Sequence, residues 1–224
     1  MYLSRLILNP RNRGVLRELA EPYEMHRTLM KAFPKGQSHE ERDAEDAVGL
    51  LYRIDREHDT IGVLVQSRAA PEWGWLAEQT DSRGCSYLAR PVESKLINVE
   101  VAADQVLTFR LRANPTKRLS ADKGSTGKRV GLYTEEEQLG WLQRKGGQHG
   151  FRVLQSQVRS DGKIKNGNAI RRDDGVHDLE LLSVQFDGVL QVADPDLLIR
   201  AVEKGIGSAK GFGFGLLSLA PAHA

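Results

Sequence analysis

The order of strand-like and helix-like segments constrains the fold of this chain more than any other feature of the sequence, because both halves show the same order. Residues 2–9 alternate apolar and polar side chains as a strand does, and residues 11–33 have helical character with a break near Glu21 and Pro22. The first half is predicted to run strand, helix, strand, strand, helix, strand over residues 2–9, 11–33, 48–57, 60–67, 71–78 and 85–90. This βαββαβ order is that of a ferredoxin-like unit.

The second half repeats this order with clearer helix signals. Thr134 is a predicted N-cap with Glu137 three residues later, and Asp194 is a predicted N-cap followed by Pro195. The elements are predicted over residues 105–112, 134–145, 151–158, 179–192, 195–204 and 212–219, with a bend of the fourth element at residues 187–188. The halves share no residue-by-residue repeat. We therefore predict an α+β protein with tandem ferredoxin-like (RRM-like) domains, residues 1–92 and residues 98–224, joined around residues 91–98.

Composition excludes several classes of protein. Of 224 residues, 40% are hydrophobic and 28% are charged, which is ordinary for a soluble globular protein. The single cysteine, Cys85, cannot form an internal disulfide or a cysteine-based zinc site, and it suits the reducing cytoplasm, where we expect the protein. Neither a signal peptide nor an apolar stretch of about 18 residues for a membrane span is present. No histidine pair has the spacing of a helical metal site with a third ligand nearby, so we expect neither a metal nor a small-molecule cofactor.

The segment from residue 22 to residue 33 is the first candidate for a reactive surface. With about 100° per residue along a helix, Met25, Leu29 and Ala32 fall on one side and should face the core. The side predicted to face solvent carries Tyr23, His26, Arg27 and Lys31. A histidine transfers protons near neutral pH and the two cations attract phosphate, which suits cleavage of RNA by its own ribose 2′-oxygen without a metal. The same residues also fit an ordinary solvent-exposed helix.

Basic residues cluster in the second half, although the net charge of the whole chain is only +2. Many of them lie in two polar insertions, residues 113–129 and residues 160–177. The candidate contacts for an anionic partner are Arg110, Arg112, Lys117, Arg118, Lys128, Arg129, Arg159, Lys163, Lys165, Arg171 and Arg172. Such clusters are typical of nucleic-acid surfaces, although solvated charges and linkers have a similar composition.

A glycine-rich stretch, GIGSAKGFGFG, spans residues 205–215 between a predicted helix and the last predicted strand. Glycines let a phosphate backbone approach main-chain N–H groups closely, and Lys210 adds positive charge. The stretch is not a nucleotide P-loop, because the glycines precede a strand rather than a helix. A permissive turn before a twisted strand is the alternative interpretation.

Four motifs together resemble one family. They are the opening strand that ends in Leu8-Asn9-Pro10, the helix sequence PYEMHRTL, the run LRANPTKR at residues 111–118, and the terminal glycine-rich stretch. In this order they are similar to the CasE family, the CRISPR-associated endoribonucleases of type I-E systems. The resemblance extends over essentially the whole chain. It implies recognition of the CRISPR repeat RNA hairpin, metal-independent cleavage at the 3′ base of its stem to give mature crRNA, and assembly with other Cascade subunits.

The resemblance also implies roles for particular residues. Tyr23, His26 and Lys31 would be catalytic, and Arg27 would bind RNA near the scissile phosphate. The family's glycine-rich loop corresponds to residues 205–215, in which Gly207, Lys210, Gly211 and Gly213 would contact RNA. Its basic strand and loop correspond to residues 110–129, whereas residues 160–172 match in position and charge rather than in sequence. A catalytically inactive RNA-binding subunit of a ribonucleoprotein complex is the alternative function, and only the His26 side of the helix distinguishes the two.

Overall fold

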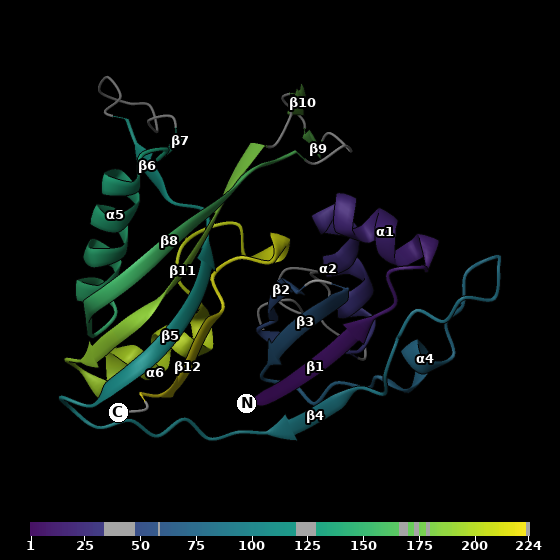
Figure 1. The fold of residues 1–224 in the computed structure, drawn as a ribbon, viewed down its shortest axis with the longest axis horizontal. Helices are drawn as coiled ribbons and strands as arrows, with labels where there is room; N and C mark the ends of the chain where they lie inside the picture. The colour runs from purple at the N-terminus through teal and green to yellow at the C-terminus, as the bar shows by residue number, and fades with distance from the viewer. Residues whose placement is uncertain are drawn as a thin grey trace. The chain divides into compact units, whose positions relative to one another are not determined.

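The computed structural model describes residues 1–33, 48–57, 59–119, 129–165, 170–172, 175–177 and 180–222 (Figure 1). The chain divides into two compact units. The first contains Met1–Val99, Asn166–Leu179 and Lys210–Gly213, and the second contains Glu100–Lys165, Glu180–Ala209 and Phe214–Ala224. A short segment near the C-terminus is therefore part of the first unit, although its neighbours in the sequence belong to the second.

The first unit is built on a four-stranded antiparallel sheet in the order β2-β3-β1-β4. Its strands are β1 (Tyr2–Leu8), β2 (Leu51–Glu57), β3 (Thr60–Ser67) and β4 (Glu93–Leu96). Its described helices are α1 (Arg13–Ala20), α2 (Pro22–Met30) and the single turn α4 (Gly74–Ala77). The predicted βαββαβ order and the predicted break between the first two helices are confirmed.

The fourth strand of this sheet lies later in the chain than the sequence predicts. Residues 85–90, which are all described, make isolated bridges such as Leu8 with Leu88, whereas Glu93–Leu96 pairs with β1 over four residues. All four residues of β4 are exposed, so the strand has no apolar alternation that a sequence pattern can detect. The prediction of a closing strand at residues 85–90 is therefore wrong, and the true edge strand lies in the stretch expected to be a linker.

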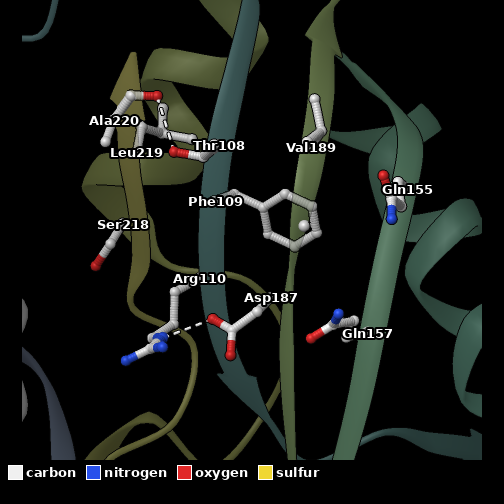
Figure 2. Close-up of a pocket in the computed structure, with 11 residues that line it drawn as sticks. Thr108, Phe109, Arg110, Gln155, Gln157, Asp187, Val189, Ser218, Leu219 and Ala220 are labelled. Carbon is white, nitrogen blue, oxygen red and sulfur yellow. Dashed lines mark hydrogen bonds and ion pairs between the residues drawn. The ribbon is translucent and has the colours of Figure 1, made fainter. Parts of the chain in front are cut away.

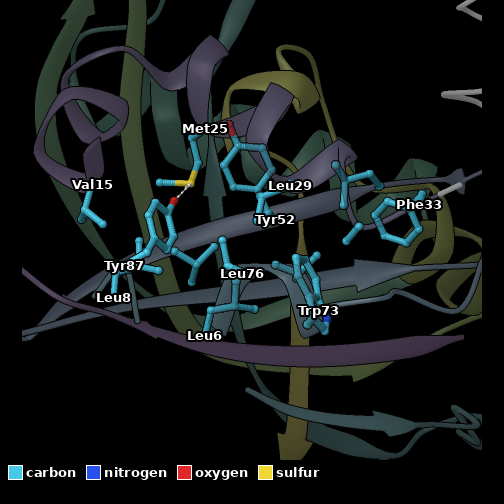
Figure 3. Close-up of a cluster of buried hydrophobic side chains, with 14 of the residues drawn as sticks. Leu6, Leu8, Val15, Met25, Leu29, Phe33, Tyr52, Trp73, Leu76 and Tyr87 are labelled. Carbon is cyan, nitrogen blue, oxygen red and sulfur yellow. Dashed lines mark hydrogen bonds between the residues drawn. The ribbon is translucent and has the colours of Figure 1, made fainter. Parts of the chain in front are cut away.

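Apolar side chains from the sheet, from α1 and α2 and from the segment around Trp73 and Leu76 form one core in the first unit (Figure 3). The predicted buried side of α2 is confirmed, since Met25, Leu29 and Ala32 are buried. Burial of each large apolar side chain contributes about 1.5–3 kcal/mol, so this side of α2 holds the helix against the sheet. Pro22 occupies the first position of α2, as predicted.

One buried carboxyl group connects helices α1 and α2 of the first unit. Glu18 of α1 is only 6% exposed and accepts hydrogen bonds from Thr28 Oγ1 of α2 at 2.9 Å and from the Tyr87 hydroxyl at 2.6 Å. Burial raises the pKa of Glu18, and the two hydrogen bonds offset part of that rise. Burial beside this carboxyl also raises the pKa of Tyr87. The three side chains fix α1, α2 and the segment before β4 to one another.

The second unit has the same sheet topology. Its strands β5 (Val106–Ala113), β8 (Phe151–Lys165), β11 (Glu180–Val192) and β12 (Leu217–Pro221) form an antiparallel sheet in the order β12-β5-β11-β8. Its helices are α5 (Glu135–Gln148) and α6 (Pro195–Lys204). Both predicted N-caps are confirmed, because Thr134 Oγ1 accepts from Glu137 N at 3.2 Å and Asp194 Oδ1 accepts from Leu197 N at 3.0 Å. The tandem ferredoxin-like fold is thus confirmed.

The insertions of the second half contain more strand than the sequence predicts. β8 continues through Lys165, where a loop was expected, and it pairs with β11 as far as Glu180. Two short hairpins follow the same trend: β6 (Thr116–Arg118) with β7 (Arg129–Gly131), and β9 (Ile170–Arg172) with β10 (Gly175–His177). The sequences of these segments have no extended alternation of apolar and polar residues, so their hydrogen-bonded ladders leave little hydrophobic signal.

The start of the last strand differs from prediction, and β11 is irregular near its predicted bend. The last strand starts at Leu217 rather than at residue 212, because a 3₁₀ turn, η1 (Lys210–Phe212), precedes it. Register shifts in β11 lie between Ser183 and Val184 and between Val189 and Leu190, on either side of the bend expected at residues 187–188. Within the described ranges, every helix is too short or too polar to span a membrane.

We predict that Glu18→Ala lowers the free energy of unfolding by about 2–4 kcal/mol, because two buried hydroxyl groups lose their acceptor. Glu18→Gln retains a carbonyl acceptor at this position, so it should destabilise less than Glu18→Ala. Urea unfolding followed by circular dichroism measures both changes.

The pH dependence of this stability has a defined sign. Because the pKa of Glu18 is raised in the folded state, its contribution is complete below the ordinary glutamate pKa of about 4.3 and falls as the pH rises through the raised value. As the pH rises through the raised pKa of Glu18, the wild type should therefore lose stability relative to Glu18→Gln. A difference between the two proteins that stays constant with pH would contradict this role of Glu18.

Candidate active site

The sequence predicts four exposed side chains on helix α2 and at its C-terminal end, and the structure shows three of them exposed. Tyr23 is 45% exposed. Arg27 is exposed and forms an ion pair with Glu24 at 3.0 Å, and the Lys31 ammonium group lies 5.7 Å from the centre of the Trp75 ring. The prediction is wrong for His26, which is only 8% exposed.

His26 is buried because a segment from the far end of the sequence covers it. The 3₁₀ turn η1 belongs to the first unit and lies against α2, so that a Cβ placed on Gly211 would be 3.8 Å from His26 Nδ1. The His26 ring is also near two tyrosine rings, with centroid distances of 6.4 Å to Tyr23 and 6.4 Å to Tyr52. On the outer side, the Phe212 ring is 6.1 Å from that of Tyr23. The structure thus brings together the histidine helix and the glycine-rich stretch, which the sequence analysis found separately.

Tyr52 is the member of this site that the sequence analysis missed. It lies on β2, its side chain is fully buried, and its hydroxyl group is 2.9 Å from the Pro22 carbonyl oxygen and 3.2 Å from that of Gly211. The strand pattern alone predicts an apolar core position here, and a tyrosine in such a position requires a hydrogen-bond partner. That requirement is the available sequence signal, although it does not identify the partner.

The glycines of the terminal stretch have different structural requirements. Gly213 has a φ of +80°, and a Cβ there would lie 2.9 Å from Tyr52 Cε2. Gly207, in the second unit, has a φ of +88°, and its Cβ would lie 3.2 Å from the Trp141 ring. Both positions therefore need glycine for backbone conformation and close packing. Gly211 has neither restriction, since a Cβ there meets only ordinary contacts.

Most of the predicted cationic contacts of the second unit already have acidic partners. On one face of the sheet, Arg110 pairs with Asp187 and Arg159 pairs with Asp161, while Arg112 lies 3.8 Å from Asp161 and donates to Ser183 at 2.9 Å. A pocket of about 580 Å³ lies over this face, and Figure 2 shows Arg110 and Asp187 pointing toward each other beside Gln157 and Ser218. The carboxylates keep the guanidinium groups of this face in fixed positions.

A second group of cations lies on and near the β6–β7 hairpin. Lys117 is 2.9 Å from Glu137, which lowers the pKa of that carboxyl, and Lys163 is 2.9 Å from Glu180, which raises the pKa of that ammonium group. Arg118 and Arg129 are directly opposite each other across the hairpin, both exposed, and neither has an ion pair in the part of the chain that the structure describes. Two like charges placed opposite each other in a ladder repel, so this pair favours a bound anion.

The remaining predicted residues fall in two places. Lys210 lies on η1 in the first unit, beside Gly211. Lys128 and the side chains of Lys165, Arg171 and Arg172 lie outside the described residues, as does the acidic stretch at residues 37–46. Among the described side chains, no three of His, Cys, Asp or Glu are grouped as metal ligands would be.

Comparison with known proteins identifies the family of the chain. The model of a family described as "CRISPR associated protein" matches residues 1–221. The CRISPR-associated endoribonuclease Cse3 of Thermus thermophilus is 39% identical over 229 residues, which cover 99% of this chain and 100% of that protein. This chain belongs to the CasE/Cse3 family. A second member, the CRISPR system Cascade subunit CasE of Escherichia coli, is 32% identical over 99% of this chain and 100% of its own length.

A solved structure in the family has the same fold. The structure of CRISPR endoribonuclease Cse3 bound to a 19-nucleotide RNA superposes with a TM-score of 0.81 at 36% identity, over 99% of this chain and 100% of that one. The similarity covers both ferredoxin-like units of this CasE/Cse3-family chain. It also confirms the family resemblance of the four sequence motifs.

We predict that Gly213→Ala destabilises the first unit by about 1–3 kcal/mol, because alanine is strained at positive φ and its Cβ would displace the Tyr52 ring. Gly211→Ala is the matched control two residues away, and it should change the free energy of unfolding by less than about 0.5 kcal/mol. Urea unfolding of the two variants gives the comparison. If the two variants lowered the free energy of unfolding equally, the close approach of the Gly213 backbone to Tyr52 would not require glycine at that position.

Proposed function

We propose that this chain is the endoribonuclease that processes precursor CRISPR RNA. It recognises the repeat hairpin, cleaves at the 3′ base of the stem and remains bound to the mature crRNA as a Cascade subunit. Two relatives support this proposal: Cse3 is an endoribonuclease with an RNA-bound structure, and CasE is a Cascade subunit. The observation that carries it is the position of His26, which lies near Tyr23, Tyr52 and the glycine-rich turn.

The chemistry we propose is transesterification within the RNA. The 2′-oxygen on the 5′ side of the cut loses its proton and attacks the adjacent phosphorus, the bond from phosphorus to the 5′-oxygen breaks, and that oxygen gains a proton. The products are a 2′,3′-cyclic phosphate and a 5′-hydroxyl. His26 transfers one or both of these protons, and Tyr23 orients the reacting groups. Lys31 and Arg27 offset charge on the phosphate, and the reaction uses no metal or small-molecule cofactor.

Recognition of the stem rests on phosphate contacts in this proposal. Double-stranded RNA has a deep, narrow major groove, so proteins recognise it mainly by shape and by its backbone. Arg118 and Arg129 repel each other across β6 and β7, and a phosphate between them would remove that cost. Exposed ion pairs such as Lys117 with Glu137 contribute only about 0–1 kcal/mol, so their cations exchange readily onto phosphate.

A catalytically inactive RNA-binding subunit is the second function that fits these residues. The cations of the second unit support binding equally well in both cases. A pure binder, however, has no use for a proton-transferring histidine on a helix that also presents an exposed lysine and arginine. We place the reaction in the cytoplasm, together with the other Cascade subunits.

We predict that the cleavage reaction survives EDTA and depends on the 2′-hydroxyl. A single deoxyribose on the 5′ side of the scissile phosphate should abolish cleavage of repeat RNA without weakening binding. His26→Ala should slow cleavage by about 10²–10⁴-fold with nearly unchanged RNA affinity, since general acid–base catalysis supplies that range. Single-turnover gel assays and filter binding measure the two quantities.

The outcomes of this experiment separate the two functions. A wild-type protein that binds the repeat hairpin but never cuts it is the inactive subunit. Cleavage of the deoxy-substituted RNA at the normal rate, or a requirement for Mg²⁺, would exclude the 2′-oxygen mechanism. Full activity of His26→Ala would remove α2 from the active site.

We predict that Arg118→Gln and Arg129→Gln each weaken binding of the repeat hairpin. Each should also reduce the slope of log K against log salt by up to about 0.9, the value for one phosphate contact on a duplex. Arg152→Gln is the matched control, because Arg152 is exposed at the start of β8, outside the proposed contacts. An unchanged salt slope in the Arg118→Gln, Arg129→Gln double variant would place the RNA elsewhere.

A further inference from the structure

We propose that Tyr52 is a positioning residue for the cleavage reaction, because it clamps the glycine-rich turn onto helix α2 and so sets the position of the His26 ring. This inference rests on the proposed function of His26. Tyr52 is fully buried in the core of the first unit, so it acts through His26 and does not touch RNA.

The hydroxyl group of Tyr52 joins the start of helix α2 to the glycine-rich turn. It lies 2.9 Å from the carbonyl oxygen of Pro22, the first residue of α2, and 3.2 Å from the carbonyl oxygen of Gly211 in η1. A phenol has one proton to donate, so the two carbonyl groups share it. Removal of this hydroxyl leaves both carbonyl oxygens without that donor and releases the turn from the start of the helix.

The ring of Tyr52 supplies the second half of the clamp. On one side its centroid lies 6.4 Å from that of the His26 ring, with an angle of 28° between the planes. On another side it meets the Gly213 backbone so closely that a Cβ there would lie 2.9 Å from Cε2. The ring therefore fills the space between the histidine and the end of the turn, and the missing side chain at Gly213 makes room for it.

The Tyr52 hydroxyl group also controls the position of the backbone that covers His26. The Tyr52 hydroxyl group bonds to the carbonyl oxygen of Gly211, and the backbone of Gly211 also covers His26. A small displacement of the turn therefore changes the position of His26 relative to Tyr23 and to the bound phosphate. Misplacement of a catalytic group by about 1 Å reduces a rate by as much as about 10²-fold.

The test compares Tyr52→Phe with Tyr87→Phe. Both replacements remove one buried tyrosine hydroxyl from the same core, but that of Tyr87 contacts Glu18 and the Met25 sulfur rather than the glycine-rich turn. Three quantities are measured for each protein: the single-turnover cleavage rate at saturating repeat RNA, the Kd for that RNA, and the imidazole NMR signals of His26 without RNA. The His26 signals are assigned by their loss in His26→Ala.

We expect Tyr52→Phe to shift the His26 signals and to slow cleavage by about 10–100-fold, with a Kd within about threefold of the wild type. Tyr87→Phe should lower stability, but because its hydroxyl group contacts α2 only through Glu18 and Met25, it should slow cleavage and shift the His26 signals much less than Tyr52→Phe does. Site-specific p-aminophenylalanine at position 52 restores an N–H donor and should recover both the rate and the signals.

Several results would overturn the clamp. They are wild-type behaviour of Tyr52→Phe in both rate and His26 signals, equal slowing by both variants, or a loss of RNA affinity as large as the loss of rate. If Tyr52→Phe does not fold, a folded p-aminophenylalanine protein with displaced His26 signals contradicts the clamp, and one with wild-type signals and rate supports it. A wild-type protein that does not cleave would instead refute the proposed function, and the His26 signals would still test the clamp.

Discussion

Burial of the apolar side of α2 against the first sheet is the interaction on which the candidate site depends. Met25 and Leu29 are fixed in the core, so the helix cannot rotate, and His26 is then directed toward the glycine-rich turn rather than toward water. The Glu18 carboxylate adds directional bonds to this apolar contact through Thr28 and Tyr87. A nonspecific hydrophobic force thereby sets the helix in place, and a few buried hydrogen bonds select one orientation of it.

Local signals made the architecture predictable. The cap at Thr134, the cap at Asp194 and the proline at the start of α2 are all determined within a few residues of sequence, and each is where the sequence places it. β4 was missed because its side chains are exposed, and a strand held only by backbone pairing shows no periodic apolar pattern. The same reason explains why β8 extends past its predicted end.

The candidate site was only half predictable. Helical periodicity identified the residues of α2 but not the burial of His26, because the backbone that covers it comes from the other end of the chain. Tyr52 had no motif of its own. The ion pairs of the basic residues depend on strand register, as when Arg110 faces Asp187 across β5 and β11, and a count of charges cannot give that register. The basic composition alone therefore suggests unpaired cations, whereas several of these cations form ion pairs in the structure.

The membership of Lys210–Gly213 in the first unit has a consequence for synthesis of the protein. A ribosome releases the α2 helix early, but the turn that covers His26 is synthesised only after most of the second unit. The nascent first unit therefore carries its histidine without its cover until residues 210–213 have emerged. Synthesis of that turn thus becomes a condition for assembly of the histidine site, and a product truncated before it lacks a finished one.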